Sequence, residues 1–165
     1  EALAGVAWDV TQDLGVSLWV ARGYSSISYL HSAAGHINSA LNAGKTAHIY
    51  NLGDHDPSGC NAWEKACEEL RGFADDPSRV HFDRIAVTPA QIRAMNLPSR
   101  PTKKTDSRSS GFKGESVELD AIPPDGLRRI IREAIEAHIP KHVRTAHDRT
   151  EEQERATLYA LQDYL

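Results

Sequence analysis

The chain has 165 residues, of which 40% are hydrophobic and 25% are charged, and its formal net charge at pH 7 is -4. The length and composition predict one globular domain with room for a small appendage. The negative net charge gives no overall electrostatic reason to expect binding to nucleic acid. No apolar run approaches the roughly 20 residues of a membrane span and no signal-peptide pattern opens the sequence, so no membrane partner is expected.

The first part of the chain predicts helices and strands in alternation. Apolar residues at helical spacing predict a helix over residues 2–14, which Gly15 closes. The β-favouring run VSLWVA predicts a strand over 16–21, and a second helix is expected over 25–43. The run TAHIYNL then predicts a strand over 46–52.

Strand and helix continue to alternate up to residue 97. A helix is predicted over 60–73, a strand over 80–87 and a short helix that begins with proline over 89–97. This alternation predicts an α/β fold in which right-handed crossovers join parallel strands. The sequence begins at Glu1 rather than Met, and it begins with a helix, so we expect a piece of a longer protein whose first strand precedes Glu1.

The end of the sequence predicts two further helices. A short extended piece is expected over 115–122, followed by a helix that begins with proline over 123–139. The last helix is expected to begin at Thr150, where Glu152 and Gln153 complete an approximate capping box. Its leucine stripe either docks on this domain or meets a partner; the stripe consists of Leu158, Leu161 and Leu165.

The cysteines and one pair of histidines are best explained without a disulfide or a metal. Cys60 and Cys67 lie seven residues apart in one predicted helix, so their Cα atoms would be about 10 Å apart, too far for a disulfide. Free thiols in a reducing compartment are expected. His138 and His142 lie four apart, but Pro140 interrupts the helix between them, which favours surface histidines over a metal pair.

Two aspartates follow the predicted strand 46–52 in the stretch DHDPSG. Asp54 and Asp56 are two residues apart, and in extended backbone such side chains point the same way. Like charges this close repel each other and resist burial, so a cation is expected between them. Mg²⁺ commonly takes one or two carboxylates and completes its shell with water and phosphate oxygens. In a parallel sheet the site would lie at the carboxyl ends of the strands, where ligands bind.

Four interpretations of this stretch compete. The first is an Asp-rich turn that caps the following helix. The second, an EF-hand loop, fails because its twelfth position requires Glu and the twelfth residue from Asp54 is Lys65. The third is a phosphatase of the haloacid dehalogenase type, which is weakened by Ser58-Gly59 where an apolar residue after Thr or Val is expected. The fourth is the Toprim arrangement, D-x-D-x-x-G after a buried strand with a glutamate ending an earlier strand.

A basic loop follows the last predicted strand. Residues 98–114 show no periodicity, and five basic residues against one acid, Asp106, give them a net charge of +4. The basic residues are Arg100, Lys103, Lys104, Arg108 and Lys113. Either this is a solvated surface loop, or its charge beside a carboxylate site binds a phosphate backbone.

Four blocks, taken together and in order, resemble the Toprim domain of the topoisomerase VI A subunit and of its relative, the meiotic double-strand-break transesterase. DHDPSG resembles the family's D-x-D-P-x-G without a mismatch, and ARGYSSISYL resembles a strand end followed by G-x-G-Y-P. The four blocks are ARGYSSISYL at 21–30, DHDPSG at 54–59, IAVTPAQIRAMNLP at 85–98, and SVELDAI at 116–122, in which Glu118 aligns with a family glutamate.

The chain departs from the family pattern at three places. Glu1-Ala2-Leu3 matches the end of the block that carries the family's catalytic glutamate, which places that glutamate two residues upstream; a shifted register keeps Glu1 as a candidate. Ser25 stands where the family has Pro, and Ser116-Val117 replaces Lys-Ala.

The resemblance implies a Toprim (Rossmann-like) parallel sheet flanked by helices over residues 1–140, with a C-terminal helical extension over 141–165. It implies that Asp54 and Asp56 bind Mg²⁺, for which Mn²⁺ can substitute, and that they act with Glu1 as the catalytic residues. A cation held there would neutralise the charge that develops on a phosphodiester under attack.

The resemblance also implies DNA as the expected partner. Arg22 would clamp a phosphate, and three residues of the basic loop would bind the backbone without reading sequence: Lys103, Lys104 and Arg108. In this family a tyrosine on a separate winged-helix domain is the nucleophile, and this sequence contains no such segment. A homodimer and a cytoplasmic or nucleoid-associated location also agree with the family.

Other functions stay open beside this one. Without the tyrosine, the domain could act as a nuclease that uses activated water. It could instead be a non-catalytic Toprim-fold module that binds nucleic acid or a partner. A haloacid-dehalogenase-like phosphatase is the weaker alternative.

Overall fold

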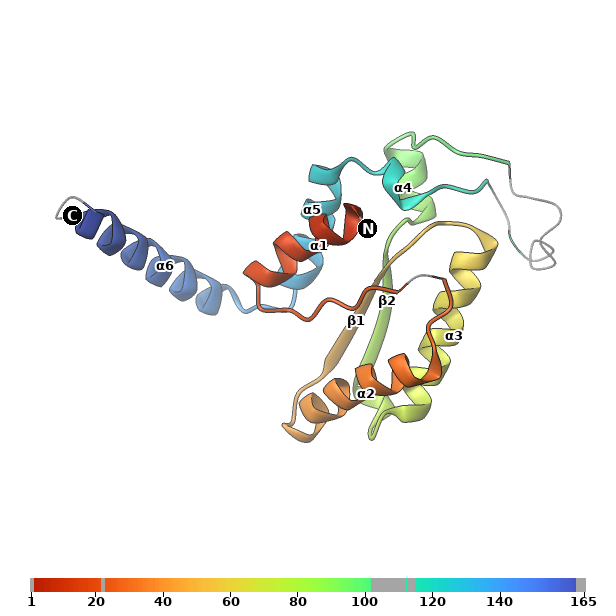
Figure 1. The fold of residues 1–165 in the computed structure, drawn as a ribbon, viewed down its shortest axis with the longest axis horizontal. Helices are drawn as coiled ribbons and strands as arrows, with labels where there is room; N and C mark the ends of the chain where they lie inside the picture. The colour runs from red at the N-terminus through yellow and green to blue at the C-terminus, as the bar shows by residue number, and fades with distance from the viewer. Residues whose placement is uncertain (1, 22, 102–111, 113–114, 163–165) are drawn as a thin grey trace. The chain divides into compact units, whose positions relative to one another are not determined.

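The computed structural model describes the whole chain except residues 1, 22, 102–111, 113–114 and 163–165 (Figure 1). The chain divides into two compact units, Glu1–Ile131 and Arg132–Leu165. The division falls within one helix, whereas the expected boundary at residue 140 lies in the break that follows that helix.

The described residues form a mixed α/β fold with a parallel pair of strands, which confirms the α/β part of the predicted fold class. Two helices come first, helices and strands then alternate from the second helix up to residue 94, and helices make up the end of the chain (Figure 1). The elements are α1 (Ala2–Asp13), α2 (Ile27–Asn42), β1 (Ala47–Leu52), α3 (Pro57–Phe73), β2 (Val80–Ala86), α4 (Pro89–Ala94), α5 (Pro124–Glu136) and α6 (Lys141–Gln162).

Among the described residues the sheet consists of β1 and β2, which run parallel as predicted. Ala47 pairs with Val80, and the register continues to Asn51 and Arg84 before an irregularity brings Leu52 opposite Ala86. The helix α3 makes the crossover between the two strands (Figure 1). The two strands therefore end side by side, next to the start of α3.

The strand predicted over 16–21 is wrong. Gly15 ends α1 as expected, with a φ of +64°, but the six residues after it form no regular secondary structure and pair with no strand of the described chain. Apolar β-favouring residues form a strand only where a neighbouring backbone accepts their hydrogen bonds, and β1 pairs only with β2 among the described strands. Side chains hold the segment instead: the Tyr29 hydroxyl donates to the Val20 carbonyl at 2.9 Å, and the ring of Trp19 packs edge-on against that of Tyr29.

One face of the sheet is packed against α2 and α3. Leu30 and Ala34 of α2 meet Leu70 of α3 in a buried cluster, and Phe82 of β2 packs against it. The guanidinium of Arg71 lies 4.6 Å above the Phe82 ring, which adds a cation–π contact. This packing holds α3, and with it the loop that precedes α3, in a defined position on the strands.

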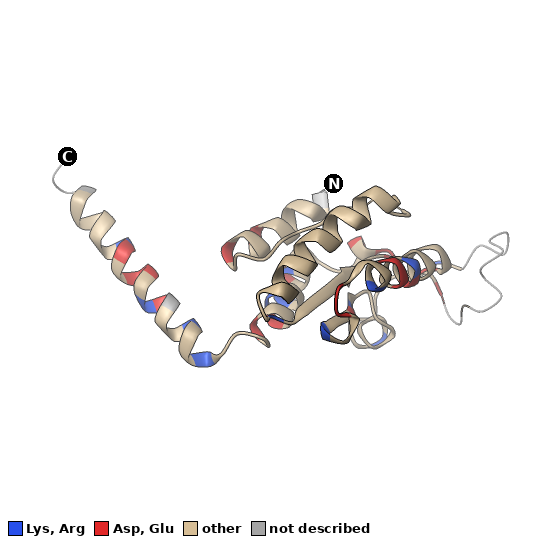
Figure 2. Cartoon of the chain, turned by 90° about the horizontal axis from the view of Figure 1, so that it is seen from below, with Lys and Arg blue, Asp and Glu red and all other residues tan. Residues whose placement is uncertain are grey.

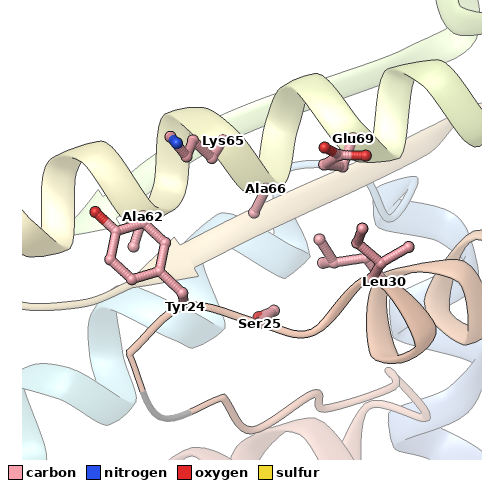
Figure 3. A pocket seen from close by; sticks show the side chains of 8 residues that line it. Tyr24, Ser25, Leu30, Ala62, Lys65, Ala66 and Glu69 are labelled. Carbon is pink, nitrogen blue, oxygen red and sulfur yellow. The ribbon is translucent and has the colours of Figure 1, made fainter.

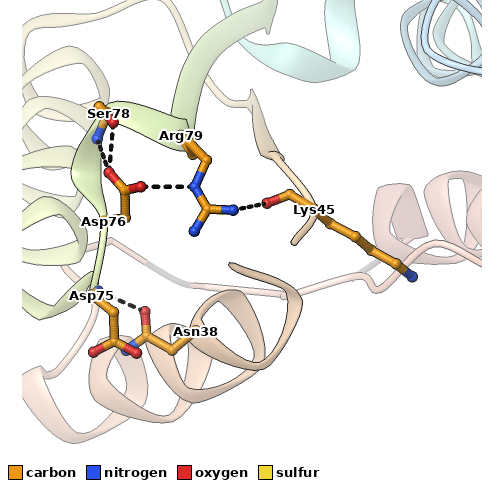
Figure 4. A network of polar contacts seen from close by, with 6 residues as sticks. All are labelled: Asn38, Lys45, Asp75, Asp76, Ser78 and Arg79. Atoms are coloured by element: carbon orange, nitrogen blue, oxygen red, sulfur yellow. Dashed lines mark hydrogen bonds and ion pairs between the residues drawn. The ribbon is translucent and has the colours of Figure 1, made fainter. Parts of the chain in front are cut away.

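A polar network ties the loops at the amino ends of the strands (Figure 4). Arg79 donates to the Asp76 carboxylate at 2.7 Å and to the carbonyl of Lys45 at 3.2 Å. The backbone N–H of Asp75 donates to Asn38 of α2 at 3.0 Å. Hydrogen bonds from Ser78 and Arg79 lower the pKa of Asp76. This network therefore joins the turns that precede β1 and β2, at the amino ends of the two strands.

The last helix begins earlier than its sequence predicts. The α6 helix starts at Lys141, directly after Pro140, and the predicted capping residue Thr150 lies inside it, where its hydroxyl donates to the carbonyl of Ala146. A threonine whose hydroxyl donates to a carbonyl of the preceding turn can lie inside a helix and does not have to occupy the N-cap. Arg144 pairs with Glu136 across the break between α5 and α6.

The leucine stripe of α6 is exposed where it is described. Leu158 is 67% exposed and Leu161 is 56% exposed, while Leu165 lies outside the described residues. Basic and acidic residues both occur along this helix (Figure 2). His138 lies in the turn that follows α5 and His142 in the first turn of α6, so Pro140 separates them as expected. None of the described helices is long and apolar enough to cross a membrane.

Candidate functional site

Asp56 begins α3 as its N-cap. Its backbone is extended, its Oδ1 accepts the N–H of Gly59 at 2.6 Å, and Pro57 occupies the first turn of the helix. Aspartate is among the best N-cap residues because its carboxylate satisfies a donor that the first helical turn leaves unpaired. The interpretation of this stretch as a capping turn therefore describes what Asp56 does in the structure.

Asp54 joins the end of β1 to a distant part of the chain. It is exposed, and its Oδ1 accepts the backbone N–H of Leu119 at 2.7 Å. Next to it, His55 pairs with Val117 through two backbone hydrogen bonds of 2.8 and 3.0 Å. The stretch DHDPSG and the stretch SVELDAI, which lie more than 50 residues apart, therefore meet at this end of the strand.

The same contact positions Glu118 and the base of the basic loop. Glu118 lies between the two residues that bond to His55 and Asp54, and its carboxylate pairs with Arg100 at 2.8 Å. Arg100 also pairs with Ser116 through two backbone hydrogen bonds. Both ends of the loop 101–115 therefore begin beside the two aspartates, although Lys103, Lys104 and Arg108 lie outside the described residues.

Position 59 requires glycine because the backbone of Asp54 lies too close to leave room for a side chain there. A Cβ atom at this position would lie 2.6 Å from the carbonyl oxygen of Asp54 and 3.2 Å from Oδ1 of Asp56. Carbon atoms do not approach a backbone oxygen so closely without a shift of the chain. The glycine of D-x-D-x-x-G therefore has a local steric reason, independent of any ligand.

Arg84 is the residue of this region that sequence reasoning missed. From β2 its guanidinium donates to the carbonyls of Gly53, at 2.6 Å, of Asp54, and of Val87, at 3.2 Å. It thus joins the ends of both strands. An available signal was its position in VHFDRIAV, because alternation places Arg84 on the same side of the strand as Phe82, which packs against the core.

The surroundings of Arg84 shift the pKa values of two neighbours. Burial lowers the pKa of His55, and the charge of Arg84 lowers it further while Asp56 opposes them. Burial raises the pKa of the Cys60 thiol, and the positive charge of Arg84 partly offsets this by lowering it. His55 packs its ring on Phe112, with centroids 5.0 Å apart. Cys60 and Cys67 are both free thiols, as predicted.

A solvent-open hollow of about 380 Å³ lies between the start of α2 and one side of α3 (Figure 3). Tyr24 and Ser25, from the stretch RGYSS, line one side, and Lys65 and Glu69 of α3 line the other. The Tyr24 hydroxyl donates to Asn61 at 2.7 Å. The RGYSS stretch thus contacts the same helix that Asp56 caps.

The loop at the end of β1 contains oxygen donors of the chemical type that Mg²⁺ prefers. The described hydrogen bonds of Asp54 and Asp56 use Oδ1 of each carboxylate, which leaves Oδ2 of each as an oxygen donor. The amide Oδ1 of Asn51 is buried and has no hydrogen-bond partner among the described residues. In the part of the chain that the structure describes, no three or more His, Cys, Asp or Glu side chains are grouped to hold a metal, so water or phosphate would complete the shell.

Of the residues expected at the site, the structure describes Asp54 and Asp56 and places them in one loop. Glu1 and Arg22 lie outside the described residues, as do the three lysine and arginine residues of the basic loop named above. In comparisons with known proteins, no family model, no curated protein and no solved structure matches this chain.

Proposed function

We propose that the Glu1–Ile131 unit is a Toprim-type domain that binds Mg²⁺ through Asp54 and Asp56 and takes part in cleavage or strand transfer of a nucleic-acid phosphodiester, with DNA as the expected substrate. The observation that carries the proposal is the meeting of DHDPSG and SVELDAI at the carboxyl end of a parallel strand. Ligands of open α/β sheets bind at that end.

The residues of this chain would bind the cation and hold the ends of the strands in position. Asp54 and Asp56 would supply the carboxylate oxygens that bind the cation. When bound, Mg²⁺ would offset the negative charge that develops on the phosphodiester oxygens. Arg84 would keep the ends of both strands in place through their carbonyl groups. The nucleophile would be either a tyrosine on a winged-helix domain or a water molecule.

Cleavage of supercoiled plasmid DNA in Mg²⁺ or Mn²⁺ tests the proposal. The double variant Asp54→Asn/Asp56→Asn should lose metal-dependent nicking. The double variant Glu151→Gln/Glu152→Gln changes the net charge equally on α6 and should keep it. Binding of Mn²⁺, measured by electron paramagnetic resonance, should follow the same pattern. If the unsubstituted chain neither binds Mn²⁺ nor nicks DNA, the proposal is wrong.

A non-catalytic module that binds nucleic acid or a partner is the second candidate, and one observation favours it. Each aspartate already accepts a backbone N–H, so the two carboxylates have compensation without a metal. Gel-shift assays with the same aspartate variant would distinguish the two functions. Unchanged DNA binding by the variant, without cleavage by either protein, would support the module.

A further inference from the structure

Two histidines stack on neighbouring strands, away from the aspartates. His48 of β1 and His81 of β2 are partners in the parallel register, and their imidazole rings lie 4.8 Å apart between centroids with 23° between their planes. Neighbouring strands of a sheet lie about 4.8 Å apart, so each ring stands directly beside the other. Both residues are exposed.

These histidines belong to the face of the sheet that α2 and α3 do not cover. Along β2, buried Val80 and core-packing Phe82 alternate with exposed His81 and Asp83. Because side chains alternate between the two faces of a strand, His81 and Asp83 share the opposite face. Parallel sheets normally cover both faces with apolar residues, so a histidine pair on an exposed face calls for an explanation of its own.

We propose that His48 and His81 form a site for a late first-row transition-metal ion such as Zn²⁺ or Cu²⁺. Imidazole nitrogen is a preferred ligand of these ions, and two nitrogens bound to one Zn²⁺ at about 2.1 Å lie about 3.4 Å from each other. Stacked rings on paired residues reach that separation by rotating about their Cβ–Cγ bonds, without movement of the strands.

Asp83 adds negative charge to the same face. It is the register partner of Tyr50, two residues beyond the histidine pair on both strands. The charge of Asp83 contributes to raising the pKa of Tyr50, after burial, which agrees with their proximity. With two protein ligands and water in the remaining positions, the ion would bind reversibly and would tie β1 to β2.

The histidine site is separate from the aspartate site in place and in chemistry. From His48 to the end of β1 the strand runs four residues, or about 13 Å. Carboxylate oxygens prefer Mg²⁺ and Mn²⁺, whereas imidazole prefers Zn²⁺, Cu²⁺ and Ni²⁺. Binding at the histidines therefore does not depend on the proposed function.

Titration of the whole chain without an affinity tag tests the site, using Zn²⁺ in isothermal calorimetry. Replacing His48 or His81 with Asn should weaken Zn²⁺ binding by roughly 10–100-fold or more, since loss of even an outer partner of a metal ligand has this effect. The matched control His138→Asn/His142→Asn removes two exposed histidines elsewhere and should leave the affinity unchanged. The variant Asp54→Asn/Asp56→Asn should also keep it.

A second measurement observes the unsubstituted protein directly. Substoichiometric Cu²⁺ should broaden the ring-proton NMR signals of His48 and His81 before those of the other six histidines. If Zn²⁺ binds equally to the unsubstituted protein and to His48→Asn, or if Cu²⁺ first broadens other histidines, the proposal is overturned. Absence of Zn²⁺ binding would overturn it as well and would leave the pair as a stacking contact between strands.

Discussion

Two stretches of this chain are similar in sequence and different in structure. In each, a short β-favouring run is followed by a polar turn with glycine: VSLWVA before RGYSS, and TAHIYNL before GDHDPSG. The second run became β1, and its turn makes hydrogen bonds to β2, to α3 and to the segment around Val117. The first run pairs with no described strand, and Val20 in it is 54% exposed.

The comparison shows that a β-favouring run forms a strand only when a second strand lies beside it and pairs with its backbone. Residues 47–52 have β2 beside them and Arg84 at their end, whereas residues 16–21 are held by single side-chain contacts such as that from Tyr29. Substitutions in the loop after β1 should therefore affect stability strongly, and those in the unpaired segment should affect it little.

The largest effect is expected at Arg84. Replacing it with Met should lower the free energy of unfolding by about 3 kcal/mol, because hydrogen bonds from a charged donor contribute about 1.5–3 kcal/mol and several carbonyls lose theirs. Denaturant unfolding followed by circular dichroism measures the change. The control Arg93→Met removes an exposed arginine of α4 and should change stability by less than about 0.5 kcal/mol. Equal losses in the two variants would contradict the role of Arg84.

Gly59→Ala should cost about 2 kcal/mol, as expected when an added carbon forces the backbone to shift. The same substitution at Gly72, in the last part of the same helix, meets no atom within 4 Å and should raise stability by up to about 1 kcal/mol. Thermal and denaturant unfolding of both variants gives the comparison. A neutral Gly59→Ala variant would show that the loop is looser than the structure indicates.

Substitution of Asp56 separates its two roles. Asp56→Ala should cost about 1 kcal/mol through loss of the N-cap, whereas Asp56→Asn should keep nearly all of the stability because Asn caps equally well. Both variants should bind Mn²⁺ more weakly if the carboxylate is a metal ligand. Equal Mn²⁺ affinity in Asp56→Asn and in the unsubstituted protein would assign Asp56 to the cap alone.

The smallest effect is expected in the unpaired segment. Val20→Thr should change the free energy of unfolding by less than about 0.5 kcal/mol, because the Val20 side chain is exposed and the hydrogen bond described for this residue is accepted by its carbonyl, which the substitution keeps. The same change at Val80, which is 5% exposed in β2, should cost about 1–3 kcal/mol for burying a hydroxyl group. A large loss at Val20 would indicate that residues 16–21 pack as a strand does.

The local elements were largely predictable, and the misses have physical causes. Helical spacing and Gly15 located α1, and two apolar runs located β1 and β2. The strand at 16–21 was predicted wrongly because β propensity does not tell whether a partner strand lies beside the segment. The start of α6 was missed because Thr150 has the composition of a cap but lies mid-helix, where its hydroxyl bonds to the preceding turn.

For the candidate site, spacing predicted that Asp54 and Asp56 follow a strand and precede a helix. It did not predict which donors they meet, because Leu119 lies 65 residues further along the chain. Nor did it predict Arg84, whose three carbonyl acceptors come from the ends of two strands.

The sequence by itself determined the α/β class, the parallel strands, the free cysteines and the place of the two aspartates, because these depend on periodicity and on residues close in the chain. Only the tertiary structure decided that His55 meets Val117, that His48 stands beside His81, and that residues 16–21 stay unpaired. Such contacts depend on which backbones lie next to each other, and packing of the whole unit sets that.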